Sequence, residues 1–148
     1  MKGMFSFAKQ FNCNISEWDT SNVQTMDSMF KHAMKFNADI TQWNVEKCFN
    51  MIDMFHFARR FNQDISQWET TKLAYMKGMF LDAIDFQKDL SSWDLSNVHD
   101  IKQENAFQDN DFFNSGMDLL HIRQFYANHN EMYRKRIKTE QEQNIIFL

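Results

Sequence analysis

The sequence predicts an α/β repeat fold: a short right-handed solenoid of 25-residue coils, each with a short strand and a short helix, closed by a C-terminal helical cap. Three observations predict it. Residues 1 to about 100 superimpose on themselves at a shift of 25 without a gap. Apolar residues in each copy follow first a helical and then a strand-like spacing. One copy is too short to bury its own apolar side chains, so stacked copies must bury them for one another.

Aromatic residues mark the repeat most clearly. Four tryptophans share one position of the repeat: Trp18, Trp43, Trp68 and Trp93. Four phenylalanines share another: Phe5, Phe30, Phe55 and Phe80. Because each side chain would pack on its equivalent in the next coil, these eight residues are predicted to form a ladder through one continuous core.

Two local patterns alternate within a copy. In residues 26–33, apolar side chains fall at i, i+3, i+4 and i+7, which predicts about two turns of helix. Residues 36–43 are rich in β-branched and aromatic residues and predict a short strand, with a bend before Trp43 because Ile40 lies three residues earlier. A strand and a helix per 25 residues suit a leucine-rich-repeat-like coil. In that stack, an amide ladder is expected from Asn12, Asn37 and Asn62, with Gln87 at its end.

The repeat divides the chain in two. Residues 1–105 hold four to five copies, and residues 106–148 form a C-terminal segment with a helix expected at about 116–141. We expect this helix to cap the last coil; alternatively, its basic cluster at residues 134–138 reaches a partner. At the N-terminus no cap precedes the first copy. The first helix could serve as the cap, the sequence could be a fragment, or another chain could cover that end, which leaves self-association or docking through either end open.

The copies resemble a known family of repeats. Residues 54–68 read MFHFARRFNQDISQW, the clearest copy. They are similar to the repeat of BspA-like surface proteins and of the mycoplasma lipoprotein-associated 25-residue repeat family of unknown function. The resemblance covers residues 1 to about 101. It implies a leucine-rich-repeat-type solenoid and a role at a cell surface in adhesion or host contact, and it carries no catalytic residues.

An acidic column is expected next to the strands. Asp39, Asp64 and Asp89 share one position of the repeat, so stacking would set the three carboxylates about 5 Å apart. Such a column would raise each neighbour's pKa or attract cations, and a weak calcium site is one interpretation. A second interpretation is that each carboxylate accepts hydrogen bonds from nearby turn amides. A third is a stripe that contacts a partner.

Positions that differ between copies indicate where a partner would bind. Phe7 and Phe57 share one such position, opposite the predicted helical core face, and Arg59 and Arg60 lie nearby in the sequence. Aromatic and arginine side chains are enriched at binding hot spots. We therefore expect these four residues to contact a protein partner of unknown identity.

Several classes of function are not expected. The net charge is −4, so the basic excess that phosphate binding needs is missing and nucleic acid is not an expected partner. No apolar run is long enough to insert into a membrane. The five histidines show no metal-ligand spacing, and no catalytic constellation or glycine-rich phosphate loop stands out. We therefore predict no enzyme activity, no cofactor and no metal.

The predicted function is a non-catalytic protein-protein interaction module related to BspA-like surface and adhesion proteins. The alternative is a structural or scaffold component of a larger assembly, such as a virion or multiprotein complex. The resemblance implies a cell surface. Because the sequence shows neither an export signal nor a lipidation cysteine near its start, an intracellular place or a place in a larger assembly is equally open.

Overall fold

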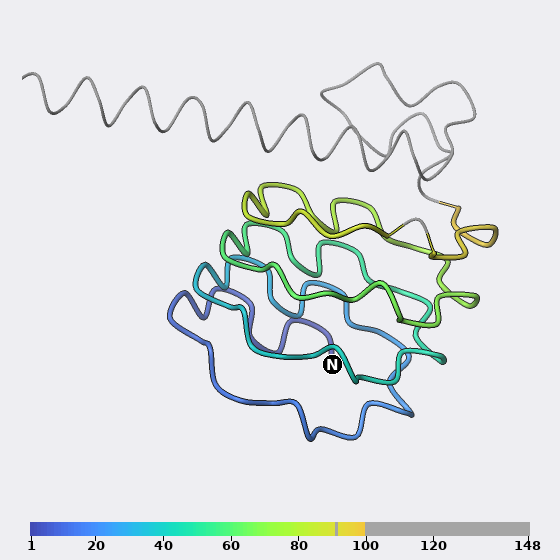
Figure 1. The fold of residues 1–148 in the computed structure, drawn as a ribbon, viewed down its shortest axis with the longest axis horizontal. Coiled ribbons are helices and arrows are strands. Elements are labelled where there is room, and N and C mark those ends of the chain that lie inside the picture. Colours follow the sequence, from blue (N-terminus) through green and yellow to red (C-terminus); the bar gives the residue numbers. More distant parts are fainter. Residues whose placement is uncertain (91, 100–148) are drawn as a thin grey trace, which may run out of the picture.

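The chain winds through four successive coils in the computed structural model, which describes residues 1–90 and 92–99. We number them coil 1 (1–25), coil 2 (26–50), coil 3 (51–75) and coil 4 (the described part of 76–99). In Figure 1 the coils lie side by side along one direction, from the blue first coil to the yellow end of the fourth. Residues one repeat apart in sequence are therefore neighbours in space.

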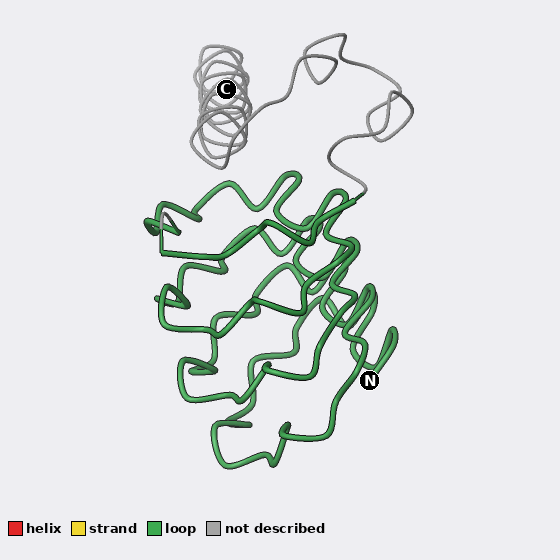
Figure 2. Ribbon diagram, turned by 90° about the vertical axis from the view of Figure 1, so that its right-hand side faces the viewer, coloured by secondary structure: helices red, strands yellow, loops and turns green. Residues whose placement is uncertain are grey.

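These coils contain neither helices nor strands: all residues that the structure describes are turns, bends and extended loops, as Figure 2 shows. The nearest approach to a sheet in this part is a pair of isolated parallel bridges, from Thr25 to Asn50 and from Asn50 to Tyr75. The predicted fold class, an α/β solenoid with a strand and a helix in each coil, is therefore wrong for the described residues. The proposed cap at residues 106–148 and the boundary at residue 105 lie outside the described residues.

Tight turns replace the predicted helix. In coil 2 the amide of Met29 donates to the carbonyl of Met26, three residues earlier, over 3.1 Å, and Ser28 between them has φ 55°. Residues 30–33 repeat this turn, with φ 59° at His32. A bond from residue i+3 to residue i with positive φ at i+2 defines a type II turn. A right-handed helix cannot continue through such left-handed residues.

The same turns explain the spacing that suggested a helix. Apolar residues occupy the first and last positions of each turn, three apart, and point into the core, while the central residues lie outside. A further turn joins Ile40 to Trp43, whose amide donates to the Ile40 carbonyl over 3.1 Å. The predicted bend before Trp43 is thus present, but as a turn instead of an irregularity in a strand.

Backbone hydrogen bonds tie each coil to the next. In residues 26–32 every second amide donates to the carbonyl of the residue 24 positions later, and the amides of Met29 and Lys31 close the turns. The four bonds join Met26 to Asn50, Ser28 to Ile52, Phe30 to Met54 and His32 to His56, over 2.7 to 2.9 Å. Turn formation and coil stacking therefore satisfy the same stretch of backbone, as a buried chain requires.

The predicted amide ladder is also present. The Asn12 side-chain oxygen accepts from the Asn37 amide over 2.8 Å, and Asn37 in turn accepts from the Asn62 amide over 2.9 Å. The Gln87 amide donates to Asn62 over 3.1 Å and ends the ladder. Each asparagine thus satisfies a backbone donor of the following coil.

Two rows of phenylalanine rings fill the core. The row Phe5, Phe30, Phe55 and Phe80 has ring centroids 5.7 to 5.8 Å apart from coil to coil. The second row, Phe11, Phe36, Phe61 and Phe86, has spacings of 5.7 to 5.9 Å. Within coil 2, the Phe30 and Phe36 rings stack 3.7 Å apart. Because the rings of the two rows also pack against each other, each coil buries apolar side chains of its neighbour.

The tryptophans lie beside these rows and stack in pairs. Trp18 stacks on Trp43 at 6.4 Å and Trp68 stacks on Trp93 at 6.2 Å. The indole N–H of Trp43 donates to the carbonyl of Ile15 in the coil before, over 3.1 Å. Trp68 and Trp93 form the equivalent bonds. Each of these three tryptophans therefore links two coils through both its ring and its polar atom.

Candidate interaction surface

A second column of aromatic rings lies outside the core. The His32 ring stacks on Phe7 and on Phe57, with centroids 4.6 Å apart in both pairs and planes within 11° of parallel. Phe7 is 61% exposed, and His32 and Phe57 are partly exposed. We call these three residues the aromatic file. It runs across coils 1 to 3 and is most exposed to solvent at Phe7.

The backbone beneath the aromatic file is left-handed. The φ values are 62° at Phe7, 59° at His32 and 58° at Phe57. In coil 4 the equivalent residue is Asp82, with φ 57°. Left-handed backbone suits glycine, asparagine and aspartate, whereas a bulky residue there is a genuine outlier. The turn therefore fixes where these rings point. Phenylalanine, found there in coils 1 and 3, is not a residue that the turn favours, whereas histidine, found in coil 2, is enriched on such backbone.

The second left-handed position of each coil follows the ordinary preference more closely. It holds Gly3, Ser28, Asp53 and Gly78, with φ between 52° and 65°. These are small or short polar residues. Two turns of the same geometry within one coil thus carry different classes of residue.

Positive charge surrounds the aromatic file. Burial lowers the pKa of His32 below its ordinary value of 6.5, and the nearby charges of His56, Lys31, Lys9 and Arg59 lower it further. The guanidinium of Arg59 also lies 5.8 Å from the centre of the Phe57 ring, a cation-π distance. Near neutral pH the file is therefore uncharged and bordered by permanent cations.

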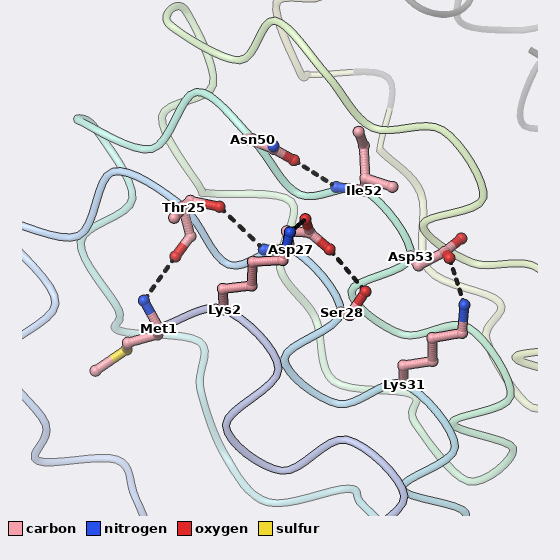
Figure 3. Close-up of polar contacts among 9 residues, drawn as sticks. All are labelled: Met1, Lys2, Thr25, Asp27, Ser28, Lys31, Asn50, Ile52 and Asp53. Carbon is pink, nitrogen blue, oxygen red and sulfur yellow. Dashed lines mark hydrogen bonds and ion pairs between the residues drawn. The ribbon is translucent and has the colours of Figure 1, made fainter.

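A partly buried carboxylate, that of Asp53, contacts two of these basic side chains. Asp53 binds Lys31 over 2.6 Å and contacts Nδ1 of His56 over 3.2 Å. Burial raises the pKa of Asp53, but the contacts with His56 and Lys31 outweigh it, so that the pKa lies below the ordinary 3.8. Figure 3 shows the Lys31–Asp53 pair and, one coil earlier, Lys2 with Asp27 at 2.9 Å. The pairs connect successive coils along one side of the turns.

The predicted acidic column acts on its own turns. The carboxylate of Asp39 accepts from the Thr41 amide over 2.9 Å, and that of Asp64 accepts from the Ser66 amide over 3.1 Å. The amide and hydroxyl of Thr41 lower the pKa of Asp39, and the hydroxyl and amide of Ser66 lower that of Asp64, so the expected rise through mutual repulsion is wrong. Asp89 is exposed at the equivalent position. Among the described residues, no group of three or more His, Cys, Asp and Glu is placed to hold a metal.

The structure brings three of the four predicted contact residues together. Phe7 and Phe57 belong to the aromatic file, and Arg59 lies over Phe57. Arg60 instead points to Asp85 of coil 4, over 3.4 Å. Sequence reasoning missed His32 as a member, although its place in the repeat between Phe7 and Phe57 was the signal.

One protein family includes this chain. No curated protein and no solved structure matches it. Within residues 1–90 and 92–99, the structure has no helix of the length and apolar character needed to span a membrane. A family model does match, over residues 1–120 and again over 42–145. The chain therefore belongs to the family described as "Mycoplasma protein of unknown function, DUF285".

Proposed function

We propose that this chain is a non-catalytic protein-interaction module that binds its partner through the aromatic file. The observation that carries this proposal is a stack of exposed or partly exposed aromatic rings, with phenylalanine on left-handed backbone at Phe7 and Phe57 and His32 stacked between them. Left-handed backbone costs about 1–2 kcal/mol for a residue other than glycine. Strain of this kind at an exposed position is a reason to look for a function.

The fold itself does not require these rings. Asp82 occupies the same position of coil 4 with φ 57°, so the turn forms without an aromatic residue. Phe7 is 61% exposed, so burial within the coils offsets little of its strain. Exposed aromatic side chains next to arginine are typical of binding hot spots. A partner that covers the file would supply the missing burial.

The turn-capping aspartates support a non-catalytic role. The side chains of Asp39 and Asp64, which share one position of the repeat, are engaged in holding local turns. Polar side chains elsewhere link coils: the Thr20 hydroxyl donates to the Asn44 carbonyl over 2.9 Å, and Thr70 forms the equivalent bond. Many of the polar side chains that recur between copies thus hold turns or link neighbouring coils.

The resemblance to BspA-like surface proteins supports a finer proposal. On this view the partner is met at a cell surface, and the module acts in adhesion or contact with a host. The repeat pattern of residues 54–68 is the feature that supports it.

The test compares the chain with two variants. Phe7→Asn combined with Phe57→Asn removes both phenylalanines and leaves residues that tolerate left-handed backbone. Phe49→Asn combined with Tyr75→Asn is the matched control, since these aromatic residues are also exposed but lie at other positions of the coil. Each protein is immobilised, captured surface proteins are identified, and the affinity of the purified partner is measured.

The proposal predicts that the Phe7 and Phe57 variant binds the purified partner at least about tenfold more weakly, and that the control binds as the parent chain does. Equal affinity of all three proteins would remove the aromatic file from the interaction. Turnover of a captured molecule by the parent chain would contradict the non-catalytic assignment.

A further inference from the structure

Charge is segregated along the positions that surround the aromatic file. The equivalent segments 6–10, 31–35 and 56–60 hold five lysines and arginines and no aspartate or glutamate, in a chain of net charge −4. These cations, which we call the basic surface, are Lys9, Lys31, Lys35, Arg59 and Arg60. The equivalent segment of coil 4, residues 81–85, instead carries Asp82 and Asp85. The sign of the charge thus reverses where the aromatic file ends.

Part of the basic surface is engaged within the stack and part is not. Lys31 binds Asp53 over 2.6 Å, and Arg60 lies 3.4 Å from Asp85. Lys9 and Lys35 are exposed and form no ion pair with any residue in the described ranges. The two lie in adjacent coils, where the Lys35 amide donates to the Lys9 carbonyl over 3.2 Å. Lys9 is near enough to His32 to lower the pKa of that ring, and Lys35 lies in the adjacent coil beside the Lys9 backbone. Neither lysine pairs with a carboxylate among the described residues.

We propose that the aromatic file and the basic surface together bind an extended acidic segment of a protein partner. This inference rests on the proposed function and names the chemistry of the partner. Carboxylates of the segment pair with Lys9 and Lys35, and its apolar or aromatic side chains pack against the exposed edge of Phe7. Charge complementarity of this kind sets the choice of partner and speeds association.

The dimensions favour a peptide over a polyanion. Two ring steps of 4.6 Å separate Phe7 from Phe57, a length that about three residues of extended chain span at ~3.3 Å each. A longer phosphate polymer or an anionic membrane would also meet Asp82 and Asp85 at the end of the basic surface. Coil 4 offers such a polymer no further cation at these positions, and Asp85 already pairs with Arg60 over 3.4 Å, whereas a short acidic segment ends before them.

Fluorescence anisotropy with synthetic peptides tests the inference on the full chain. The probe is a labelled peptide of alternating glutamate and tyrosine, and the comparison peptide has glutamine in place of each glutamate. Lys9→Glu combined with Lys35→Glu is the test variant. Lys47→Glu combined with Lys72→Glu is its control, since these exposed lysines lie elsewhere and give the same change of net charge.

The acidic peptide should bind the parent chain, and binding should weaken as NaCl rises from about 0.05 M to about 0.5 M because salt screens the attraction. The Lys9 and Lys35 variant should bind at least about tenfold more weakly, and the control less than about twofold. The inference is overturned by absence of binding, by equal binding of the glutamine peptide, or by an equal loss in the control variant.

Two further probes separate other occupants. Tighter binding of phosphatidylserine vesicles or of an oligothymidylate than of the acidic peptide would assign the surface to a polyanion. Self-association that the Lys9 and Lys35 variant abolishes would assign it to a second copy; either result overturns the inference. If the glutamine peptide binds equally and Phe7→Asn weakens that binding, the acidic preference fails while the proposed function stands. If Phe7→Asn and Phe57→Asn leave the affinity of the captured partner unchanged, the proposed function itself fails.

Discussion

Two files of aromatic rings run along the same stack of coils, and they differ in burial and in backbone. The inner row is the core row of Phe5, Phe30, Phe55 and Phe80. Its members Phe30 and Phe55 are completely buried, with centroids 5.8 Å apart. The aromatic file outside has closer centroids, at 4.6 Å, yet its Phe7 is 61% exposed and its backbone is left-handed throughout. Close stacking therefore occurs both where it stabilises the coils and where it leaves apolar surface in water.

The difference in burial shows which aromatic residues are needed for the stability of the fold. Burial of a phenylalanine side chain contributes about 1.5–3 kcal/mol, so the inner row accounts for its own presence. Exposed stacking contributes only about 0.5–1.5 kcal/mol, which left-handed strain of about 1–2 kcal/mol offsets. The inner row is thus a requirement of the stack, and the aromatic file needs another explanation, which partner binding supplies.

The largest expected effect comes from the inner row. Phe55→Ala should lower the free energy of unfolding by about 3–5 kcal/mol, because it leaves a cavity between the rings of Phe30 and Phe80. Urea denaturation followed by tryptophan fluorescence measures the loss. Phe57→Ala, two residues away but in the aromatic file, should cost far less. Similar losses for the two variants would show that the files do not differ as described.

The next effect separates strain from contact at the second left-handed position. Gly78→Ala should lower the free energy of unfolding by about 2–4 kcal/mol, because the new Cβ overlaps Oδ1 of Asp53 and φ is +65°. Gly3→Ala is the matched control: φ is +60° with nothing within 4 Å, so only the strain of about 1–2 kcal/mol remains. Thermal unfolding of the two variants gives the difference. Equal losses would mean that Asp53 moves aside at no cost.

These left-handed positions also explain what the sequence could and could not predict. The repeat, and which side chains stack on which, could be predicted because equivalent residues such as Trp18 and Trp43 recur 25 positions apart and pack on each other in neighbouring coils. The local structure was predicted wrongly because a three-residue spacing fits a type II turn as well as a helix. Gly3 and Gly78 were the overlooked signal, because glycine inside a helix is unfavourable and inside such a turn is preferred.

The candidate surface was predictable in part. Phe7 and Phe57 were expected to lie outside the core because their position varies between copies and lies opposite the predicted helical face. Phe7 is 61% exposed and Phe57 is partly exposed, although turns replace that helix. Their stacking through His32 could not be foreseen, because it depends on a left-handed backbone that aims three side chains in one direction. Charge segregation was visible in the sequence only once the equivalent segments of the coils were compared.

A pH-dependent effect tests the carboxylate that anchors the basic surface. Asp53→Asn should lower the free energy of unfolding by about 1–2 kcal/mol near pH 7, because Lys31 and His56 lose a charged partner. The folded state depresses the pKa of Asp53, so its contribution is present above the ordinary 3.8 and is lost as pH falls through the folded value. Urea unfolding at several pH values should show parent and variant converging below 3.8. A gap that persists at lower pH would contradict this account.

A smaller effect concerns the middle ring of the aromatic file. The folded state lowers the pKa of His32, so below the ordinary 6.5 the unfolded chain binds protons more readily and stability rises with pH through that window. His32→Phe should flatten this rise between about pH 5 and pH 7.5, because a ring that cannot titrate takes its place. Thermal unfolding across this range measures the slope. An unchanged slope would place the proton uptake on another group.

The smallest expected change in stability accompanies removal of the most exposed ring. Phe7→Asn should alter the free energy of unfolding by less than about 1 kcal/mol, because relief of left-handed strain opposes the loss of stacking on His32. The same variant should lose most of its affinity for the partner, so stability and binding separate at one residue. Urea denaturation and partner titration on the same preparation test both halves. A loss of several kcal/mol would make Phe7 a structural residue like those of the inner row, and the contrast between the two files would no longer indicate a binding surface.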